Sequence, residues 1–443
     1  MPCFYDKRKH KVKDKKYTHC AKQSLIELFL LSNSKKFAIA SILFILAFFV
    51  FTPLSQDDID YFALQETSFD WLSNRYNNWS SRIVIESILP FLTNHEYIFK
   101  FITILIFLST LVAVFLLSDK YKLHPIFCSL AVAIFPFYKL TSAGYAATIT
   151  NYFYPIAFTL WIVVYLFARR ATILGYIVLT LLCIFASNME QTAILLFFVG
   201  LYSFFIKNSD KKLALIAIIT SICGIYFMFT CPGNELRIIS ETKTWFEGYE
   251  IYTIKDKIEL GITSALYFLN YKGPVAFLLC FSVCVLAITR KLSYSLIITL
   301  ILTILINTYL KNTVGNKEIS LDVNWIHNID FSSVLLLLAM PVAMVLSVLF
   351  MNISVQDKIT IILLIAIGYA LRCSMGFSPT VFASNERPSM LSHMLFIFVS
   401  LYIILKCNIY RRKAFVILIL FGTYSSLNSL FRAIRSVHHA LFV

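Results

Sequence analysis

Residues 37–54 read FAIASILFILAFFVFTPL, an apolar stretch that contains no charged side chain. As an α-helix, these 18 residues span about 27 Å, close to the thickness of the hydrocarbon core of a bilayer. Polar sequence follows, SQDDIDY at residues 55–61, with no small-residue cleavage site. We therefore predict that this stretch is an uncleaved transmembrane helix.

Stretches of the same kind recur along the whole chain. Of its 443 residues, 59% are hydrophobic and 14% are charged, whereas a soluble domain is about 25% charged. Thirteen such stretches predict an all-α fold, a polytopic transmembrane helical bundle with about thirteen spans. They cover residues 37–54, 98–117, 125–138, 155–167, 171–186, 192–206, 213–230, 274–288, 292–309, 334–350, 359–373, 391–405 and 414–426.

Basic residues mark one side of this bundle. Every short break assigned to that side carries a lysine or an arginine, as expected of cytoplasmic loops: Lys120, Lys122, Arg169, Arg170, Lys207, Lys211, Lys212, Arg290, Lys291, Lys358, Lys406, Arg411, Arg412 and Lys413. A basic segment, residues 1–36, precedes the first span. We predict a cytoplasmic N-terminus. Topology then explains the net charge of +15 without a nucleic-acid partner.

The opposite side carries longer loops and most of the carboxylates of the transmembrane domain, residues 37–443. The loops are residues 55–95, 139–154, 187–191, 231–273, 310–331 and 374–390. This asymmetry predicts that any chemistry takes place at the outer face. Ionisable groups are scarce inside the spans, which argues against a channel or a transporter.

Three acids stand directly after the first span. Asp57 and Asp58 lead this group and Asp60 follows, so the acids lie at the membrane interface, where polarity falls steeply. A carboxylate there can accept a proton from a sugar hydroxyl or bind a metal ion. We predict that Asp57 and Asp58 are catalytic; the alternative is a solvated loop whose acids have no special role.

Later in the same loop, Trp79 and Arg82 precede an amphipathic segment, residues 83–92. An arginine in this position can bind a phosphate through two parallel hydrogen bonds, and Trp79 is a further candidate for substrate binding. The alternative is an interfacial tryptophan and an arginine whose charge reaches toward the membrane surface.

Further candidates for substrate binding come from four other outer loops. Each has a structural alternative: an interfacial aromatic residue, a turn residue, a helix stop or an interfacial arginine. The candidates are Asn151, Tyr152, Glu190, Asn234, Arg237 and Arg387. The chain contains no GxGxxG, Walker, HExxH or GxSxG motif of soluble enzymes.

The order of these motifs resembles a bacterial family of polytopic membrane proteins. A pair of aspartates after the first span is followed by Trp-x-x-Arg, Asn-Tyr-x-x-Pro, a turn with glutamate, Pro-Gly-Asn-x-x-Arg and Ser-Pro…Glu-Arg. The architecture is similar to GT-C glycosyltransferases, including the glucosyltransferases that modify O-antigen in serotype conversion. The resemblance covers residues 37–405, and it implies that Asp57 or Asp58 acts as the base or binds a divalent cation. The large outer domain of some GT-C enzymes is missing.

This resemblance implies the transfer of a sugar such as glucose from a polyprenyl-phosphate carrier. The acceptor is a cell-surface polysaccharide, such as O-antigen, or a lipid-linked acceptor at the outer face. Because nucleotide sugars are cytoplasmic, a membrane-borne donor also explains the missing nucleotide-binding motif. Two alternatives remain: a polysaccharide polymerase, and a flippase or transporter of lipid-linked sugars.

Overall fold

The computed structural model describes residues 25–64, 67–119, 125–168, 171–206, 209–271, 274–290, 292–314, 331–406 and 411–442. These residues are helical with no strand among them, so the predicted all-α fold is confirmed. Much of the predicted basic segment and of loop 310–331 lies outside the described residues, as do Lys120, Lys122, Arg169, Arg170, Lys207 and Lys291. The orientation in the membrane stays a prediction.

Seven helices among the described residues are long and apolar enough to cross a membrane. They are Ser34–Phe51, Glu96–Leu117, Tyr145–Phe167, Lys211–Phe229, Val355–Phe377, Arg387–Ile404 and Phe415–His438. An eighth span results if Ile254–Asn270 and Val275–Thr289, bent by 76° relative to each other, count as one.

Each of the thirteen predicted stretches coincides with a helix, but several of these helices are short. For example, α11 (Ile173–Ala186) and α12 (Glu190–Phe205) contain 14 and 16 residues. Such helices extend over only about 21–24 Å, less than the roughly 30 Å of hydrocarbon. Length and composition therefore support seven or eight spans.

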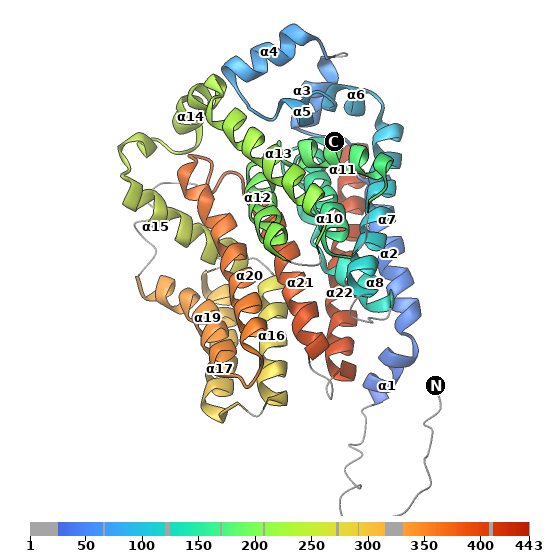
Figure 1. Cartoon of the computed structure of the whole chain (residues 1–443), viewed down its shortest axis with the longest axis vertical. Coiled ribbons are helices and arrows are strands. Elements are labelled where there is room, and N and C mark those ends of the chain that lie inside the picture. Colours follow the sequence, from blue (N-terminus) through green and yellow to red (C-terminus); the bar gives the residue numbers. More distant parts are fainter. Residues whose placement is uncertain are drawn as a thin grey trace, which may run out of the picture.

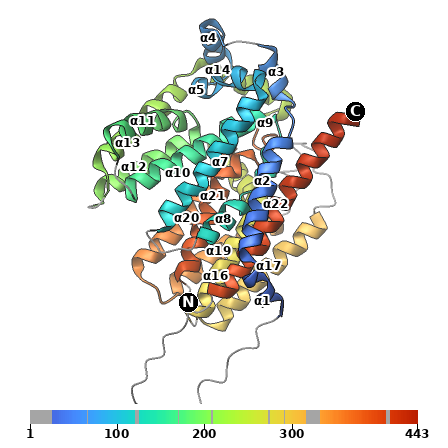
Figure 2. The ribbon, with the colours of Figure 1, turned by 90° about the vertical axis from the view of Figure 1, so that its right-hand side faces the viewer.

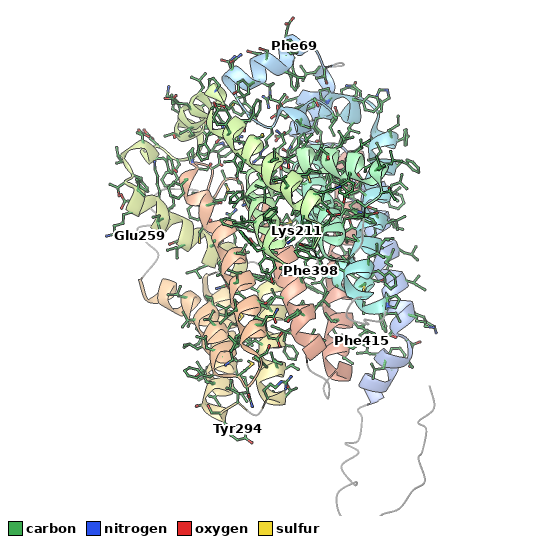
Figure 3. All side chains as sticks on the ribbon, in the orientation of Figure 1. Phe69, Lys211, Glu259, Tyr294, Phe398 and Phe415 are labelled. Carbon is green, nitrogen blue, oxygen red and sulfur yellow. The ribbon has the colours of Figure 1, made fainter. Side chains whose placement is uncertain are left out.

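The helices form an elongated bundle with a distinct cap at one end. The first long helix, α2 (Ser34–Phe51), packs against the last, α22 (Arg411–Phe442) (Figures 1 and 2). At the upper end in Figure 1 lie α3 (Asp57–Ala63), α4 (Phe69–Asn78), α5 (Ile83–Glu86), α6 (Leu89–Asn94) and α14 (Pro232–Trp245). We call this the loop end. Phe69 stands at its tip (Figure 3).

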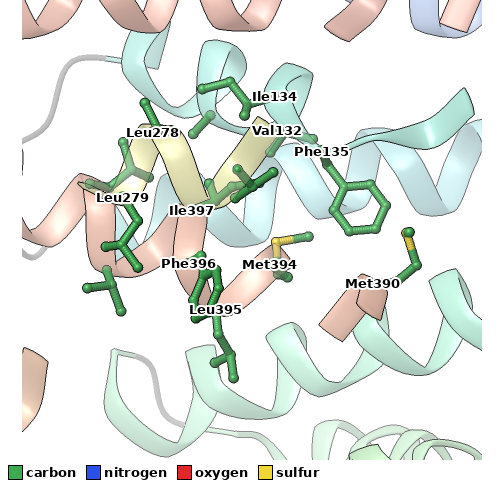
Figure 4. Packing of buried hydrophobic residues seen from close by; sticks show 14 of the residues in the cluster. Val132, Ile134, Phe135, Leu278, Leu279, Met390, Met394, Leu395, Phe396 and Ile397 are labelled. Carbon is green, nitrogen blue, oxygen red and sulfur yellow. The ribbon is translucent and has the colours of Figure 1, made fainter. Parts of the chain in front are cut away.

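The core is a continuous apolar layer between helices from both halves of the sequence. Figure 4 shows Phe135 and its neighbours packed near Leu278 of α16 (Pro274–Thr289) and Met394 of α21 (Met390–Lys406). The main contacts of α16 are with α21, and α8 (Pro125–Ile134) packs against α22. This packing fixes the ends of the helices that carry the loop-end residues.

Proline determines where the first long helix ends. Pro53 disfavours a helical conformation at Thr52, which is extended, so α2 stops at Phe51. Gln56 then adopts a positive φ of 51° and turns the chain into α3. The aspartates of α3 fall in its first turn, where the partial positive charge of a helix N-terminus favours acids.

Candidate functional site

The loop end contains a cavity of about 670 Å³, a volume typical of small-ligand sites. Its wall comes from the α2–α3 turn, the α4–α5 region, the segment around α9 (Tyr145–Thr148), α14 and the segment before α21. Seven of the ten predicted site residues line it: Asp57, Trp79, Arg82, Asn151, Tyr152, Arg237 and Arg387. The structure thus gathers residues from distant parts of the sequence in one place.

Asp57 is the first residue of α3; it is exposed to solvent and lines the cavity. It forms no ion pair with any described residue, whereas the other carboxylates of the wall, Glu86 and Glu241, each pair with an arginine. Desolvation raises the pKa of the Asp57 carboxyl above its usual value, and the charge of Arg387 opposes this rise. A carboxylate with these properties is suited to accept a proton from a ligand.

Asp58 is fully buried and does not line the cavity. One carboxylate oxygen accepts hydrogen bonds from the backbone N–H groups of Ser55, Tyr145 and Ala146 at 3.0, 2.6 and 3.2 Å. The other accepts one from Ala147 at 2.8 Å. Burial raises the pKa of the Asp58 carboxyl, and these hydrogen bonds oppose the rise.

This geometry corrects the prediction that Asp58 is a catalytic base. Both of its oxygens are occupied by backbone donors, and Asp58 itself is absent from the cavity wall. Three of these donors belong to the first turn of α9, where N–H groups have no partner within the helix. The Asp58 side chain therefore caps a helix and leaves Asp57 as the candidate base.

Arg82 connects three of the predicted residues. Its Nη2 and Nε donate hydrogen bonds to the Glu190 carboxylate at 2.7 and 3.3 Å, and its Nη1 donates to Asn151 Oδ1 at 3.3 Å. The guanidinium lies 5.8 Å from the centre of the Tyr152 ring. Glu190 is absent from the cavity wall, and its contact with this site is the ion pair that positions Arg82.

Asn151 and Tyr152 lie in a π-helical turn, Ile149–Phe153, inside the long helix that ends at Phe167. Pro155 has no N–H to donate to the carbonyl of Asn151, which interrupts the regular α-helical pattern here. The side chain of Asn151 is held in place by a hydrogen bond from its Nδ2 to the Ala147 carbonyl at 2.8 Å. The wider turn carries both side chains on the cavity wall, and such turns are frequent at functional sites.

Trp79 lies within cation–π distance of two arginines. The guanidinium carbons of Arg75 and Arg237 are 5.6 and 5.5 Å from its ring centre. Arg75 pairs with Glu86 at 2.5 Å, and Arg237 pairs with Glu241, four residues later on α14, at 2.8 Å. This part of the wall combines an aromatic face with two ion pairs, a surface that suits a sugar with its apolar faces and hydroxyl edges.

The cavity wall also contains three residues that were not predicted as site residues: Arg75, Glu86 and Glu241. One signal was available, because Glu86 stands in an apolar segment and a buried carboxylate needs a cation. That signal does not say which cation is the partner, and Arg75 is eleven positions away in another helix.

The Pro-Gly-Asn turn serves packing more than binding. Pro232 starts α14, and a Cβ on Gly233 would lie 2.3 Å from the backbone nitrogen of Trp79. Asn234 does not line the cavity; its Nδ2 donates to the Met228 carbonyl at 2.7 Å. The predicted binding role of Asn234 is therefore replaced by a role at the helix junction, which brings Arg237 to the wall.

Arg387 reaches the cavity from the segment that precedes α21. Its Nε donates to the Ser384 carbonyl at 3.1 Å, and it forms no ion pair with any described residue. Its neighbour Glu386 forms a largely buried ion pair with Lys139. Asn385, in the same segment, has a positive φ of 52°; conformations of this kind cluster at functional sites.

The described residues do not fit a metal site held by protein side chains. They contain no group of three or more histidine, cysteine, aspartate or glutamate residues placed to bind an ion. Two of the carboxylates in the cavity wall, Glu86 and Glu241, are already engaged by arginines. Positive charge at this site comes from arginine.

The fold and the cavity define the class of this molecule. It is an all-helical protein with seven or eight candidate membrane spans and a polar cavity at one end of the bundle. Comparisons with protein-family models, with curated proteins and with solved structures give no match to this chain.

Proposed function

We propose that the protein is a membrane glycosyltransferase that moves a sugar from a polyprenyl-phosphate carrier to a surface polysaccharide. The observation that supports this most is the composition of the cavity. It combines one carboxylate without an ion pair, Asp57, with four arginines and several aromatic side chains at the end of an apolar bundle. We also propose that this end faces outward, with the N-terminus in the cytoplasm and the shorter apolar helices embedded to give about thirteen membrane segments of GT-C type in a bacterial inner membrane.

The reaction is a single displacement at the anomeric carbon. Asp57 accepts the proton of the acceptor hydroxyl, whose oxygen attacks the anomeric carbon. The bond from this carbon to the phosphate oxygen breaks, and its electron pair stays on the phosphate. The arginines of the wall stabilise the added negative charge, which is commonly the largest catalytic contribution. One displacement inverts the configuration of the sugar.

Asp57 has a suitable environment for this role. It is accessible from the cavity, and its carboxyl has no competing partner among the described residues. Its raised pKa makes it a stronger base than an aspartate with the ordinary pKa. Trp79 and Tyr152 offer ring faces on which a sugar can stack.

The test uses Asp57→Asn, which keeps shape and removes charge, and Asp70→Asn as a matched control. Asp70 is exposed on α4 and absent from the cavity wall. With equal amounts of protein in membranes, we expect transfer to fall about 10²–10⁴-fold in Asp57→Asn and to be unchanged in Asp70→Asn. Equal transfer by both variants would exclude Asp57 as the base.

The structure of the surface polysaccharide with and without the gene separates the classes of function. Loss of one side-branch sugar supports the transferase. Shortened chains would indicate a polymerase, and complete polymer retained inside the cell would indicate a flippase; either result overturns the proposal.

A further inference from the structure

The four arginines of the cavity differ in their availability to an anion. Arg75, Arg82 and Arg237 each pair with a glutamate, at 2.5, 2.7 and 2.8 Å. Arg387 pairs with no carboxylate among the described residues, and its two terminal nitrogens form no hydrogen bond with them. A phosphate that approaches one of the paired arginines meets a carboxylate that repels it and competes for the same N–H groups.

The segment that carries Arg387 also offers a hydroxyl donor. Thr380 and Ser384 line the cavity together with Arg387. The Ser384 hydroxyl donates to Thr380 Oγ1 at 3.0 Å, and Thr380 Oγ1 lies 2.9 Å from the Ser378 hydroxyl. Because Ser384 already donates its proton to Thr380, the hydroxyl that can donate to a phosphate bound by Arg387 is that of Thr380.

Two buried basic residues support this segment from behind. Lys139 pairs with Glu386, directly before Arg387, and both side chains are largely buried. Arg372 is fully buried and donates from Nη2 to the Val381 carbonyl at 2.8 Å. No carboxylate among the described residues forms an ion pair with Arg372, whose guanidinium lies 4.1 Å from the centre of the Phe268 ring. Away from water its positive charge is weakly screened, and its hydrogen bond to Val381 holds that charge next to residues 380–387.

We propose that residues 380–387, with Arg387 as their cation, form the phosphate-binding subsite of the cavity. The proposal deepens the proposed function, on which the identity of the ligand as an isoprenoid phosphate rests. Asp57 and Arg387 both line the cavity without pairing with each other. We place the departing phosphate at Arg387 and the acceptor hydroxyl at Asp57; an inverting displacement requires that these two groups lie on opposite faces of the sugar ring.

The experiment measures equilibrium binding of a short-chain isoprenoid monophosphate to the purified full-length protein in detergent, without any acceptor. The variants are Arg387→Lys, Arg82→Lys and Arg237→Lys, which all keep the charge, together with Arg387→Gln. Arg435→Gln is the control, because Arg435 is exposed on α22 and absent from the cavity wall.

We expect the dissociation constant to rise about 10- to 100-fold in Arg387→Gln, which removes the charge, and about tenfold in Arg387→Lys. Lysine keeps the charge but cannot form the bidentate hydrogen bond of arginine to phosphate. Arg82→Lys, Arg237→Lys and the control Arg435→Gln should each change the dissociation constant by less than about threefold. The isoprenoid alcohol without its phosphate should bind all variants equally, which shows that each is folded. Competition by inorganic phosphate that disappears in Arg387→Gln assigns the subsite to the phosphate group itself; a lack of competition assigns it to the lipid-linked phosphate.

A larger loss in Arg82→Lys or Arg237→Lys than in Arg387→Lys would overturn the subsite, as would unchanged binding by Arg387→Gln. The result is separable from the proposed function. Binding with the expected ranking in a protein that transfers no sugar refutes the transferase and supports the subsite. Sugar transfer together with a different ranking refutes the subsite alone.

Discussion

Replacing Asp58 with asparagine should damage the fold, whereas the same change at Asp57 should damage activity. The Asp58 carboxylate accepts four backbone hydrogen bonds in a fully buried position. Asparagine keeps one acceptor oxygen and replaces the other with an NH₂ group, which cannot accept a hydrogen bond from an N–H group. At least one of the four backbone donors is then left without a partner.

The expected loss of stability follows from these contacts. A buried N–H group without an acceptor costs about 1–3 kcal/mol. Removing a negative charge from the N-terminus of a helix costs about 0.3–2 kcal/mol more. We therefore expect the free energy of unfolding to fall by about 2–4 kcal/mol in Asp58→Asn and by less than about 0.5 kcal/mol in Asp57→Asn.

The assay is equilibrium unfolding of the purified protein in one detergent, followed by circular dichroism, with transfer measured on the same preparations. Asp57→Asn should unfold like the parent protein and lack activity. Asp58→Asn should unfold earlier, and the activity of its folded fraction should fall much less. If Asp58→Asn is as stable as the parent but inactive, then Asp58 takes part in the chemistry and its assignment as a helix cap is wrong.

Three further predictions concern pH, backbone geometry and topology. Transfer should decline as the pH falls through the raised pKa of Asp57, so the acid limb of the pH–rate profile should lie at higher pH than for an aspartate with the ordinary pKa. Because the charge of Arg387 lowers the pKa of Asp57, Arg387→Gln should move this limb to still higher pH. A shift of the limb to lower pH would contradict the assignment of Asp57 as the base. Gly144→Ala should lower the free energy of unfolding by about 1–3 kcal/mol, measured in the same unfolding assay. Gly144 has a φ of 87°, and the Cβ of an alanine there would lie 2.7 Å from a carboxylate oxygen of Asp58. Reporter fusions within residues 241–250 should report the outer side of the membrane and those within residues 207–212 the cytoplasm; the reverse pattern would invert the proposed orientation.

The helical part of the fold was predictable because hydrophobicity is a local property. All thirteen predicted stretches coincide with helices, since an apolar run that must satisfy its own backbone hydrogen bonds has few other conformations. The number of spans was less predictable. Whether a helix of 14 residues, such as α11, crosses the membrane depends on its tilt and on its neighbours.

The candidate site was predictable in its composition but not in its pairing. Loops on one side of a bundle meet at one end, so residues such as Asp57, Trp79 and Arg387 converge on one cavity. The partner of Arg82, by contrast, lies 108 positions away at Glu190. No local pattern connects the two residues.

The sequence by itself determined that this protein is a helical bundle of membrane type, and it predicted that the candidate site residues belong to the polar loops between the apolar helices. Only the tertiary structure decided which of two neighbouring aspartates faces the cavity. Asp57 and Asp58 are adjacent on α3 and point about 100° apart, and the N-terminus of α9 packs where Asp58 caps it. The tertiary structure also decided which arginine is left without a carboxylate, because ion pairs form between side chains that packing brings within a few ångströms, whatever their separation along the chain.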